Sequence, residues 1–409
     1  MTEIERELSF AKGEEDFYEV ADLVAKVLSG YFETLRKGLS FVRHFPGFEP
    51  KMARVVKVGG RIVSTLLVLP FRMRLMGKEV SMGGIRNVCT HPDFRGRGLA
   101  TSLLLDALHF MREGGILVSM LLSEICDFYR RLGWEVALPN YLTVLDAESI
   151  PQDIGGLELS PLGEGDIDSV ASLYNRCYSL TNCSIVRDRT YWAEKVAFWE
   201  EVQPGWRNLF LVGRRRGEVS AYAVVHWADD RLEVLEAGAD SPGSARGLLS
   251  SLAGLALSKA RRRLDLKLPF DHLLSRVAVE FGAEQRLSAS GCMLRIVDIE
   301  GLFRAVEGEF TVRLRASALK DWSGALSFET DVGKVNLVFE EGVAKVGESS
   351  RSSLLVRLPQ SLLVQLLTGY KEPADLIGRS DFQAPDTALP LLAALFPRQY
   401  PHISPLDAF

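Results

Sequence analysis

Two arginines alternate with two glycines at Arg95, Gly96, Arg97 and Gly98, directly before a leucine-rich segment whose apolar spacing predicts a helix. The unpaired amides and the dipole at a helix N-terminus attract anions. Glycines let the backbone approach such a ligand closely, and arginines add charge-assisted hydrogen bonds. These residues predict a pyrophosphate-binding loop, although on their own they would equally suit a solvated turn. They do not form a P-loop, because no Lys-Ser or Lys-Thr pair follows.

The elements around this loop predict an α/β domain. Residues 53–85 read as a β meander with turns at Gly59-Gly60 and Gly77, which also excludes a dinucleotide fingerprint, since that needs a βαβ unit. The order then predicted is a strand, the loop, a helix, a buried strand, a short helix and a last strand, over residues 85–90, 91–98, 99–111, 115–123, 125–133 and 134–146.

The rest of the chain predicts two further domains. Residues 147–290 begin with a helical pattern and repeat a β hairpin of the first domain, with Val219-Ser220 in the place of Val63-Ser64. The arginine and glycines of this second copy are out of order, so we expect a degenerate site. Residues 291–409 show short alternating strands followed by helices, which is typical of an α+β module.

Composition narrows the class of protein. The 409 residues carry a formal net charge of −5, so we expect no nucleic-acid partner. Five cysteines without a CxxC pair and scattered histidines predict neither a disulfide framework nor a metal site. The start lacks a secretory signal, and no apolar run is long enough to span a bilayer. We therefore expect a cytoplasmic protein with no membrane span.

The motifs resemble those of the GCN5-related N-acetyltransferase (GNAT) superfamily. Its cofactor loop, R/Q-x-x-G-x-G/A, is matched by Arg95, Gly98 and Ala100, and its Y-x-x-x-G-F/W pattern by Tyr129 and the Gly133-Trp134 pair. The layout of the whole chain resembles the enhanced intracellular survival (Eis-type) acetyltransferases. That resemblance implies a catalytic GNAT fold at 1–146, a degenerate GNAT fold at 147–290 and a sterol-carrier-like α+β domain at 291–409. It also implies a homo-oligomer, namely a hexamer.

The same resemblance implies acetyl-CoA as the cosubstrate. The strand ending at Val88–Thr90 should splay from its neighbour, so that pantetheine takes main-chain hydrogen bonds as an added strand would. One more residue separates the Ser123-Glu124 pair from Tyr129 than the spacing in the family has. The residues implied in cofactor binding are Val88, Cys89, Thr90, Arg95, Gly96, Arg97, Gly98, Leu99, Ala100, Thr101, Ser123 and Glu124.

Acetyl transfer to an amine needs a base for the nucleophile and an acid for the leaving thiolate. By resemblance Tyr129 is the acid, whereas from the residue type alone it would read as a core aromatic. The base implied is the terminal carboxylate of Phe409, delivered by the third domain, with Asp407 as the alternative carboxylate. Acidic residues of the first helices, such as Asp22 and Glu33, are candidates for lining the substrate pocket.

The sequence thus predicts an N-acetyltransferase acting on the primary amines of a small cationic substrate, such as an aminoglycoside, a polyamine or a lysine-like amine. Two alternatives stay open. One is a non-catalytic protein that binds acyl-CoA or lipid, which predicts a deep apolar tunnel in the third domain. The other is an enzyme that acetylates protein lysines or N-termini.

Overall fold

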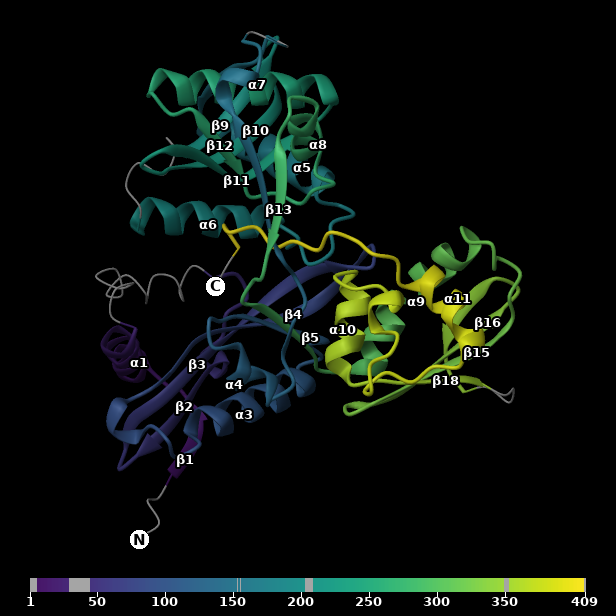
Figure 1. Ribbon diagram of the computed structural model, residues 1–409. Coiled ribbons are helices and arrows are strands. Elements are labelled where there is room, and N and C mark those ends of the chain that lie inside the picture. The colour runs from purple at the N-terminus through teal and green to yellow at the C-terminus, as the bar shows by residue number, and fades with distance from the viewer. Residues whose placement is uncertain are drawn as a thin grey trace. The chain divides into compact units, whose positions relative to one another are not determined.

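The computed structural model describes residues 6–28, 45–152, 154, 156–202, 209–348 and 353–407 (Figure 1). The chain forms two compact units. Unit 1 contains residues up to Ala137 together with Gly291–Gln399, and unit 2 contains Leu138–Ser290 together with the tail that starts at Tyr400. Both units mix sheets and helices, which confirms the predicted α/β class.

Unit 1 begins with a seven-stranded sheet in the order β1-β2-β3-β4-β5-β14-β6. Gly59 and Gly60 turn the chain between β2 and β3 with φ of 57° and 79°, values that favour glycine and suit a two-residue hairpin. The strands up to β4 are antiparallel, whereas β4 and β5 are parallel neighbours joined through α3. The strands are Arg6–Phe10, Ala53–Val58, Arg61–Leu75, Lys78–Thr90, Val118–Leu122, Cys292–Ile296 and Glu135–Val136, in sheet order.

Three helices accompany this sheet: α1 (Glu14–Val27), α3 (Leu99–Glu113) and α4 (Cys126–Arg130). The apolar face of α3 packs on β2, β3 and β4 and forms one core with α4. An ion pair also ties α3 to the sheet. The guanidinium of Arg54, on β2, donates to both carboxylate oxygens of Asp106, on α3, at 2.5 and 2.9 Å. A bidentate pair of this kind holds the helix in one orientation on the sheet.

Unit 2 is built on a second seven-stranded sheet, in the order β13-β7-β12-β11-β10-β9-β8. Its strands in that order are Glu284–Ser288, Asn140–Asp146, Arg263–Leu266, Arg231–Ala239, Glu218–Trp227, Phe210–Arg215 and Glu158–Pro161. As in the first sheet, two antiparallel pairs are followed by a helix and a parallel strand, here β9-β10-β11, α7 and β12. The predicted repeat of the hairpin, which contains Val219-Ser220, is formed by β9 and β10.

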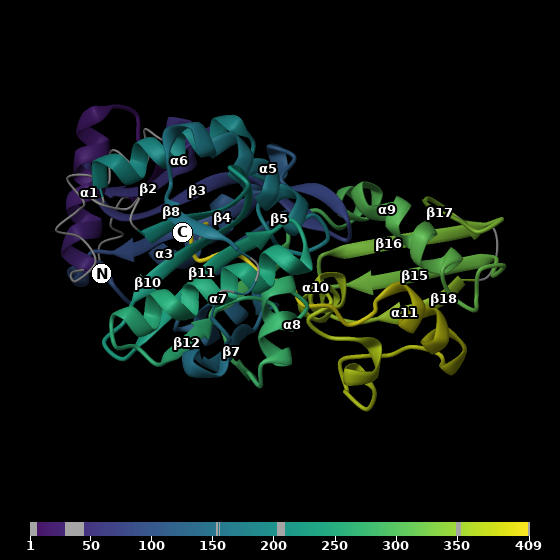
Figure 2. The ribbon, with the colours of Figure 1, turned by 90° about the horizontal axis from the view of Figure 1, so that it is seen from above.

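Helices cover both faces of the second sheet. Ala221, Ala223 and Val225 pack with α7 and α8, whereas Tyr222 and Val224 alternate with them and pack with α5 and α6. Figure 1 and Figure 2 show α7 and α6 on opposite sides of the strands. These helices are α5 (Ile167–Cys177), α6 (Arg189–Val202), α7 (Pro242–Ser258) and α8 (Leu273–Glu280).

The third sheet, within unit 1, has the order β17-β16-β15-β18, and Figure 2 shows β15, β16 and β18 side by side. The core beside this sheet is filled by four phenylalanine rings that are fully buried and contact one another, those of Phe303, Phe310, Phe328 and Phe396. The strands are Val343–Val346, Gly333–Glu340, Gly324–Thr330 and Ser353–Arg357, and the helices are α9 (Ile299–Arg315), α10 (Gln360–Thr368) and α11 (Leu389–Leu395).

Two domain boundaries differ from the sequence prediction. Residues 140–146, predicted as the last strand of the first domain, form β7 and pair with β12 and β13 of unit 2. In exchange, Cys292–Ile296, predicted to open the third domain, pairs with β5 and β6 in the first sheet. Adjacent strands were therefore assigned to the wrong sheets, because periodicity shows that a segment is extended without showing its partner.

The tail also differs from its predicted domain. Tyr400 to Asp407 were assigned to the third domain with the rest of 291–409, but they pack in unit 2. Aromatic contacts of Tyr400 and His402 with Tyr141 and the main-chain bond from His402 N–H to the Asn182 carbonyl, at 2.8 Å, fasten the tail there. The described end of the chain is thus attached to the second domain.

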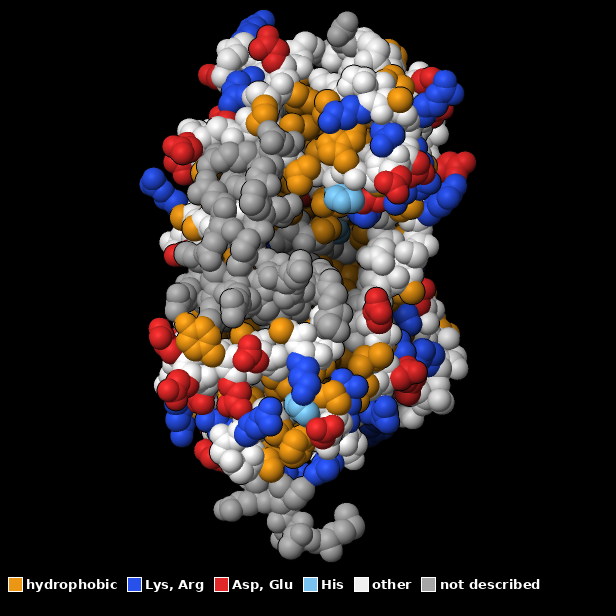
Figure 3. Space-filling view, turned by 90° about the vertical axis from the view of Figure 1, so that its left-hand side faces the viewer, with side chains coloured by type: hydrophobic (Ala, Val, Ile, Leu, Met, Phe, Trp, Pro, Cys, Tyr) orange, Lys and Arg blue, Asp and Glu red, His pale blue; other side chains and the backbone are white. Residues whose placement is uncertain are grey.

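The surface carries both signs of charge. On the face drawn in Figure 3, Lys and Arg side chains are interspersed with Asp and Glu side chains, as expected for a chain with a net charge of −5. Among the described residues, no helix is both long and apolar enough to cross a membrane.

Candidate active site

The strand that leads to the predicted cofactor loop separates from its neighbour. The parallel ladder between β4 and β5 runs only from the Met82–Val118 pair to the Ile85–Leu121 pair. Beyond it, β4 continues for five residues to Thr90, and among the described residues its partner there is β3 alone. A bulge accompanies the separation, since Asn87 has φ of 55° and two residues of β4 stand opposite one of β3. The splay expected near Val88–Thr90 is therefore present.

Main-chain groups of Val88 and Thr90 face the side that β5 has left. The next N–H along, that of His91, donates to Val63 of β3 at 2.8 Å, and the Cys89 carbonyl accepts from the Ser64 hydroxyl at 3.0 Å. Because backbone groups of successive strand residues alternate between the two edges, those of Val88 and Thr90 point the other way. This edge can accept an extended ligand as an added strand.

The loop after β4 presents an open helix N-terminus. Gly96 and Gly98 have φ of 72° and 74°, and Gly98 occupies the N-cap position of α3. A glycine has no side chain to cap the helix, so the first-turn amides keep their capacity to bind an anion. A Cβ on either glycine would meet no atom within 4 Å, so backbone conformation, and not space, is what requires glycine here.

Both arginines of the loop are exposed, and each makes a main-chain bond. Arg95 Nε donates to the Thr90 carbonyl at 3.3 Å, and Arg97 donates to the Asp93 carbonyl at 3.1 Å while its guanidinium lies 5.1 Å from the Phe94 ring centre. A cofactor arm that used the Thr90 carbonyl would replace the long Arg95 bond. Arg6 from β1 reaches the same loop, 3.4 Å from the Arg97 carbonyl.

Two of the predicted cofactor residues, Leu99 and Cys89, can offer a ligand only their main chain, because their side chains are buried. The Leu99 side chain is buried in the core under α3, and Ala100 and Thr101 follow it in the half-buried first turn. The Cys89 side chain is also buried, and burial raises the pKa of its thiol to about 12. The thiol thus stays protonated at neutral pH and is no nucleophile.

Ser123 and Glu124 follow the end of β5 but differ in their surroundings. The Ser123 N–H donates to the Gly291 carbonyl at 2.9 Å, and its hydroxyl accepts from the Ile125 N–H at 3.0 Å. None of the described residues accepts a hydrogen bond from this hydroxyl, whereas the Ser123 N–H is already bound to the residue that precedes β14. Glu124 is exposed.

Tyr129 lies on α4, in the same core cluster as Ile85 and Leu121, the last pair of the β4–β5 ladder. Its ring is 7% exposed and meets Phe128 and Trp134 edge to face, at 5.0 and 6.4 Å. Burial raises the pKa of the phenol to about 12. No described residue forms a hydrogen bond with the hydroxyl. The protonated phenol can therefore donate a hydrogen bond or a proton to a bound ligand.

The Gly133-Trp134 pair explains why the tyrosine motif has its spacing. Gly133 closes the turn that follows α4, with φ of 88°, and a Cβ there would collide with the Arg295 guanidinium. Trp134 is fully buried behind the Tyr129 ring, and its indole N–H donates to Ser119 at 3.3 Å. The motif therefore fixes the helix end and the ring that supports the phenol.

Sequence reasoning missed two polar contacts beside the loop. His91, mostly buried at the end of β4, has its Nε2 2.7 Å from the Lys26 ammonium of α1. The hydroxyls of Ser64 and Thr90 lie 2.8 Å apart across β3 and β4. The only local signal was the position of these residues next to the strand end. They hold α1 and the end of β4 beside the loop.

The corresponding place in unit 2 is filled. Strand β11 also runs on beyond its parallel ladder with β12, which ends at the Val234–Leu266 pair. There the Ala237 carbonyl accepts from the Tyr178 hydroxyl at 3.1 Å and from His272 Nε2 at 3.0 Å. The helix that follows has a side-chain cap from Ser241. In unit 2, side chains thus bind the main chain of the extended strand and cap the helix that follows it.

The predicted acidic residues have different outcomes. Asp22 of α1 is exposed, while Glu33 and Phe409 lie outside the described residues. Asp407 is fully buried in unit 2, where Arg187 donates to both of its oxygens and the Tyr191 hydroxyl donates at 2.7 Å. A carboxylate held in this way is not available as a general base, which removes the alternative to Phe409.

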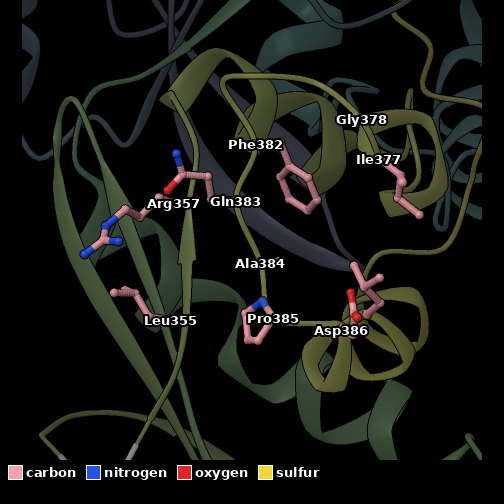
Figure 4. Close-up of a pocket in the computed structure, with 10 residues that line it drawn as sticks. Leu355, Arg357, Ile377, Gly378, Phe382, Gln383, Ala384, Pro385 and Asp386 are labelled. Atoms are coloured by element: carbon pink, nitrogen blue, oxygen red, sulfur yellow. The ribbon is translucent and has the colours of Figure 1, made fainter.

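A pocket of about 400 Å³ lies in the third-sheet region (Figure 4). Leu355 and Arg357 of β18 form one side, and Phe382 and Ile377 form the other. Ile377 is 61% exposed, and the lining includes Asp386, so the pocket is open and partly polar. It differs from the deep apolar tunnel that a lipid-carrying domain requires.

Comparison with known proteins agrees with this geometry. The family model described as Acetyltransferase (GNAT) domain matches residues 12–137. No curated protein matches the chain. The family match covers less than half of the chain, and it makes residues 12–137 similar to the GNAT acetyltransferases, a family that takes its acyl group from acyl-CoA.

Solved structures match over nearly the full length. The chain is similar to a GCN5-related N-acetyltransferase from Anabaena variabilis, with 19% identity, a TM-score of 0.79, and coverage of 99% of this chain and 100% of that one. A probable N-acyltransferase from Enterococcus faecalis shows 15% identity, a TM-score of 0.79 and the same coverage. Eis1 from Mycobacterium abscessus shows 15% identity, a TM-score of 0.71 and again the same coverage. At these identities the likeness establishes a shared fold.

Proposed function

We propose that this chain is an acetyl-CoA-dependent N-acetyltransferase that modifies primary amines of a small cationic substrate. The observation that carries the proposal is the β4–β5 ladder, which stops at Ile85. Among the described residues, no strand pairs with the outer edge of Val88–Thr90, which lies shortly before the Gly98 helix terminus. An extended, pyrophosphate-bearing cofactor needs these two features in this order.

The residues present fit acetyl-CoA. The main-chain edge of Val88 and Thr90 would hold the pantetheine arm, and the first-turn amides of α3, with Arg95 and Arg97, would hold the pyrophosphate. An exposed arginine pair beside a glycine-capped helix supplies both charge and main-chain donors. The Ser123 hydroxyl, which accepts from the Ile125 N–H, would donate its proton in a hydrogen bond to the pantetheine arm.

Tyr129 would act as the general acid. Its buried phenol keeps its proton at neutral pH, and a thiolate leaving group needs that proton. The amine nitrogen bonds the acetyl carbon as the carbon–sulfur bond breaks, Tyr129 gives its proton to sulfur, and the base takes the amine proton. A proton then returns from the base to the Tyr129 phenolate, which leaves an amide, a free thiol and the enzyme in its starting state.

The terminal carboxylate of Phe409 would be that base. A chain-end carboxylate is ionised at neutral pH, and the Asp407 carboxylate is already bound by Arg187 and Tyr191. The homo-hexamer, the cytoplasmic location and the sterol-carrier-like character of the third domain stay predictions from the resemblance.

The alternative of a non-catalytic lipid-binding protein is less well supported. Four buried phenylalanines, Phe303, Phe310, Phe328 and Phe396, fill the core between the third sheet and its helices. Because a filled core leaves no room for an acyl chain, binding would require repacking.

Thiol release from acetyl-CoA tests the proposal, measured with a panel of aminoglycosides, polyamines and lysine peptides and paired with mass spectrometry of each amine. A stoichiometric acetylated small amine is the expected result. Acetylation of peptides alone would favour the protein-modifying alternative, and acetyl-CoA binding without turnover on any amine would favour the binding protein.

A further inference from the structure

Another open strand edge lies in the third sheet, outside the candidate active site. Strand β18 pairs with β15 along one edge, and on its other edge the only bridge among the described residues joins Arg357 to Gln383. The N–H of each of these two residues donates to the carbonyl of the other, at 2.8 and 2.9 Å. This is the hydrogen-bonded pair of an antiparallel ladder, and it defines the register in which such a ladder would continue.

A proline ends that ladder after one pair. In the register of Arg357 with Gln383, the next hydrogen-bonded pair would be Leu355 with Pro385, and Pro385 has no N–H to donate. The chain then enters the 3-10 turn η7 (Asp386–Ala388) and does not continue as a strand. Because alternate residues present their main chain to the same edge, the N–H and carbonyl of Leu355 point outward as those of Arg357 do. No described residue pairs with them.

The 400 Å³ pocket of Figure 4 lies at this interrupted ladder. Its lining includes Leu355 and Pro385, the two residues that do not pair. The side chains of Ile377 and Phe382 add apolar surface, and Ile377 is 61% exposed. The volume is within the range of ligand pockets, about 300–1,000 Å³. The pocket thus combines apolar surface with a main-chain donor and acceptor that are open to a ligand.

Two opposite charges also line the pocket. Figure 4 shows Arg357 and Asp386 on opposite sides of it. The Arg357 guanidinium donates to Glu329 at 3.3 Å, so its charge is partly balanced. No described residue forms an ion pair with Asp386, whose carboxylate is exposed. A ligand that matches this pocket therefore carries a cationic group on the Asp386 side.

We propose that this edge binds an extended peptide, antiparallel to β18, with an apolar side chain in the pocket and a lysine or arginine toward its C-terminal end. One peptide residue would donate its N–H to the Leu355 carbonyl and accept from the Leu355 N–H, in the position that Pro385 cannot fill. Since the peptide runs opposite to β18, its C-terminal end lies on the Asp386 side. An acyl chain fits less well, because it would leave both main-chain groups of Leu355 unpaired.

Fluorescence polarisation with the full chain, in the absence of acetyl-CoA, tests this inference, which goes beyond the proposed acetyl transfer and does not depend on it. The probe is the blocked peptide Ser-Thr-Val-Thr-Lys with fluorescein at its N-terminus. An N-methyl group on the valine removes the N–H that Leu355 would accept, so we expect binding to weaken about fivefold or more. An N-methyl group on the threonine that follows, whose N–H points away from β18, is the matched control and should leave the affinity unchanged.

Substitutions in the protein and the peptide locate the site. Ile377→Ser should weaken binding about fivefold or more, since it removes apolar contact area. Val312→Ser, at a residue of similar exposure on α9, should leave binding unchanged. Replacing the peptide lysine by glutamine should weaken binding about two- to fivefold at low salt, and Asp386→Asn should abolish this difference.

Four results would overturn the inference. They are the absence of binding at near-millimolar protein, equal affinity of the two N-methylated peptides, equal losses from Ile377→Ser and Val312→Ser, and an unchanged lysine preference in Asp386→Asn. Decanoate serves as a competitor that represents an acyl chain. If it displaced the labelled peptide at lower concentration than the unlabelled peptide does, the pocket would be a site for acyl chains and not for peptides.

Discussion

Replacing Gly98 by alanine tests whether the helix N-terminus binds the cofactor. Gly98 has φ of 74° and ψ of 10°, and an added Cβ would meet no atom within 4 Å. The whole cost is thus conformational, roughly 1–2 kcal/mol for an L-residue in the left-handed region. If the bound loop needs this conformation and the free loop relaxes, affinity for coenzyme A falls about 5–30-fold, since 1.4 kcal/mol is about tenfold.

Isothermal titration with coenzyme A at fixed ionic strength measures this change. Gly98→Asn should recover most of the affinity, because asparagine tolerates the left-handed region. Gly282→Ala is the matched control: Gly282 has φ of 85°, open space around its Cβ position, and a place at the end of α8 in unit 2. It should lower stability and leave affinity unchanged. Unaltered affinity of Gly98→Ala beside a destabilised Gly282→Ala would refute the reasoning.

Three further predictions concern catalysis, packing and pH. Tyr129→Phe should lower kcat by about 10²–10⁴ with an unchanged urea midpoint, since no described residue bonds the hydroxyl; equal activity would exclude it as the acid. Gly291→Ala should cost about 1–3 kcal/mol in urea unfolding, because its Cβ would collide with the Ser123 backbone, and an unchanged midpoint would contradict this. Burial lowers the pKa of His272 to about 4 and of His402 to about 3, from 6.5. Because the unfolded histidines bind protons first, unit 2 should lose stability as pH falls from 6.5 toward 4, and His272→Asn should flatten that slope in urea titrations at successive pH values.

Local features of the site were predictable from sequence. The strand, loop and helix around Arg95–Gly98 appear where the pattern places them, as β4, the loop and α3. Gly-Gly turns, a left-handed helix cap and an apolar strand each act over a few residues, so their signals are local. The buried Tyr129 and Trp134 follow from the same short-range motif.

Long-range pairing was not predictable in the same way. Strands β7 and β14 lie next to the predicted domain boundaries. Strand β7 belongs to the sheet of unit 2 and β14 to the first sheet, the reverse of the prediction, because the alternation of apolar and polar residues does not identify a partner strand. A buried ionic cluster in unit 2 joins Arg187 to Glu236 and Asp407, which lie 49 and 220 residues from Arg187 along the chain. No spacing rule links such residues, so only the fold reveals them.

The terminal carboxylate is the central claim, and the steady-state rate of thiol release tests it most directly. The intact chain is compared, at saturating acetyl-CoA and amine, with a chain extended by a few residues beyond Phe409. We predict that kcat falls about 10²-fold or more on extension while coenzyme A affinity is kept. An extended chain that turns over as fast as the intact one would contradict it.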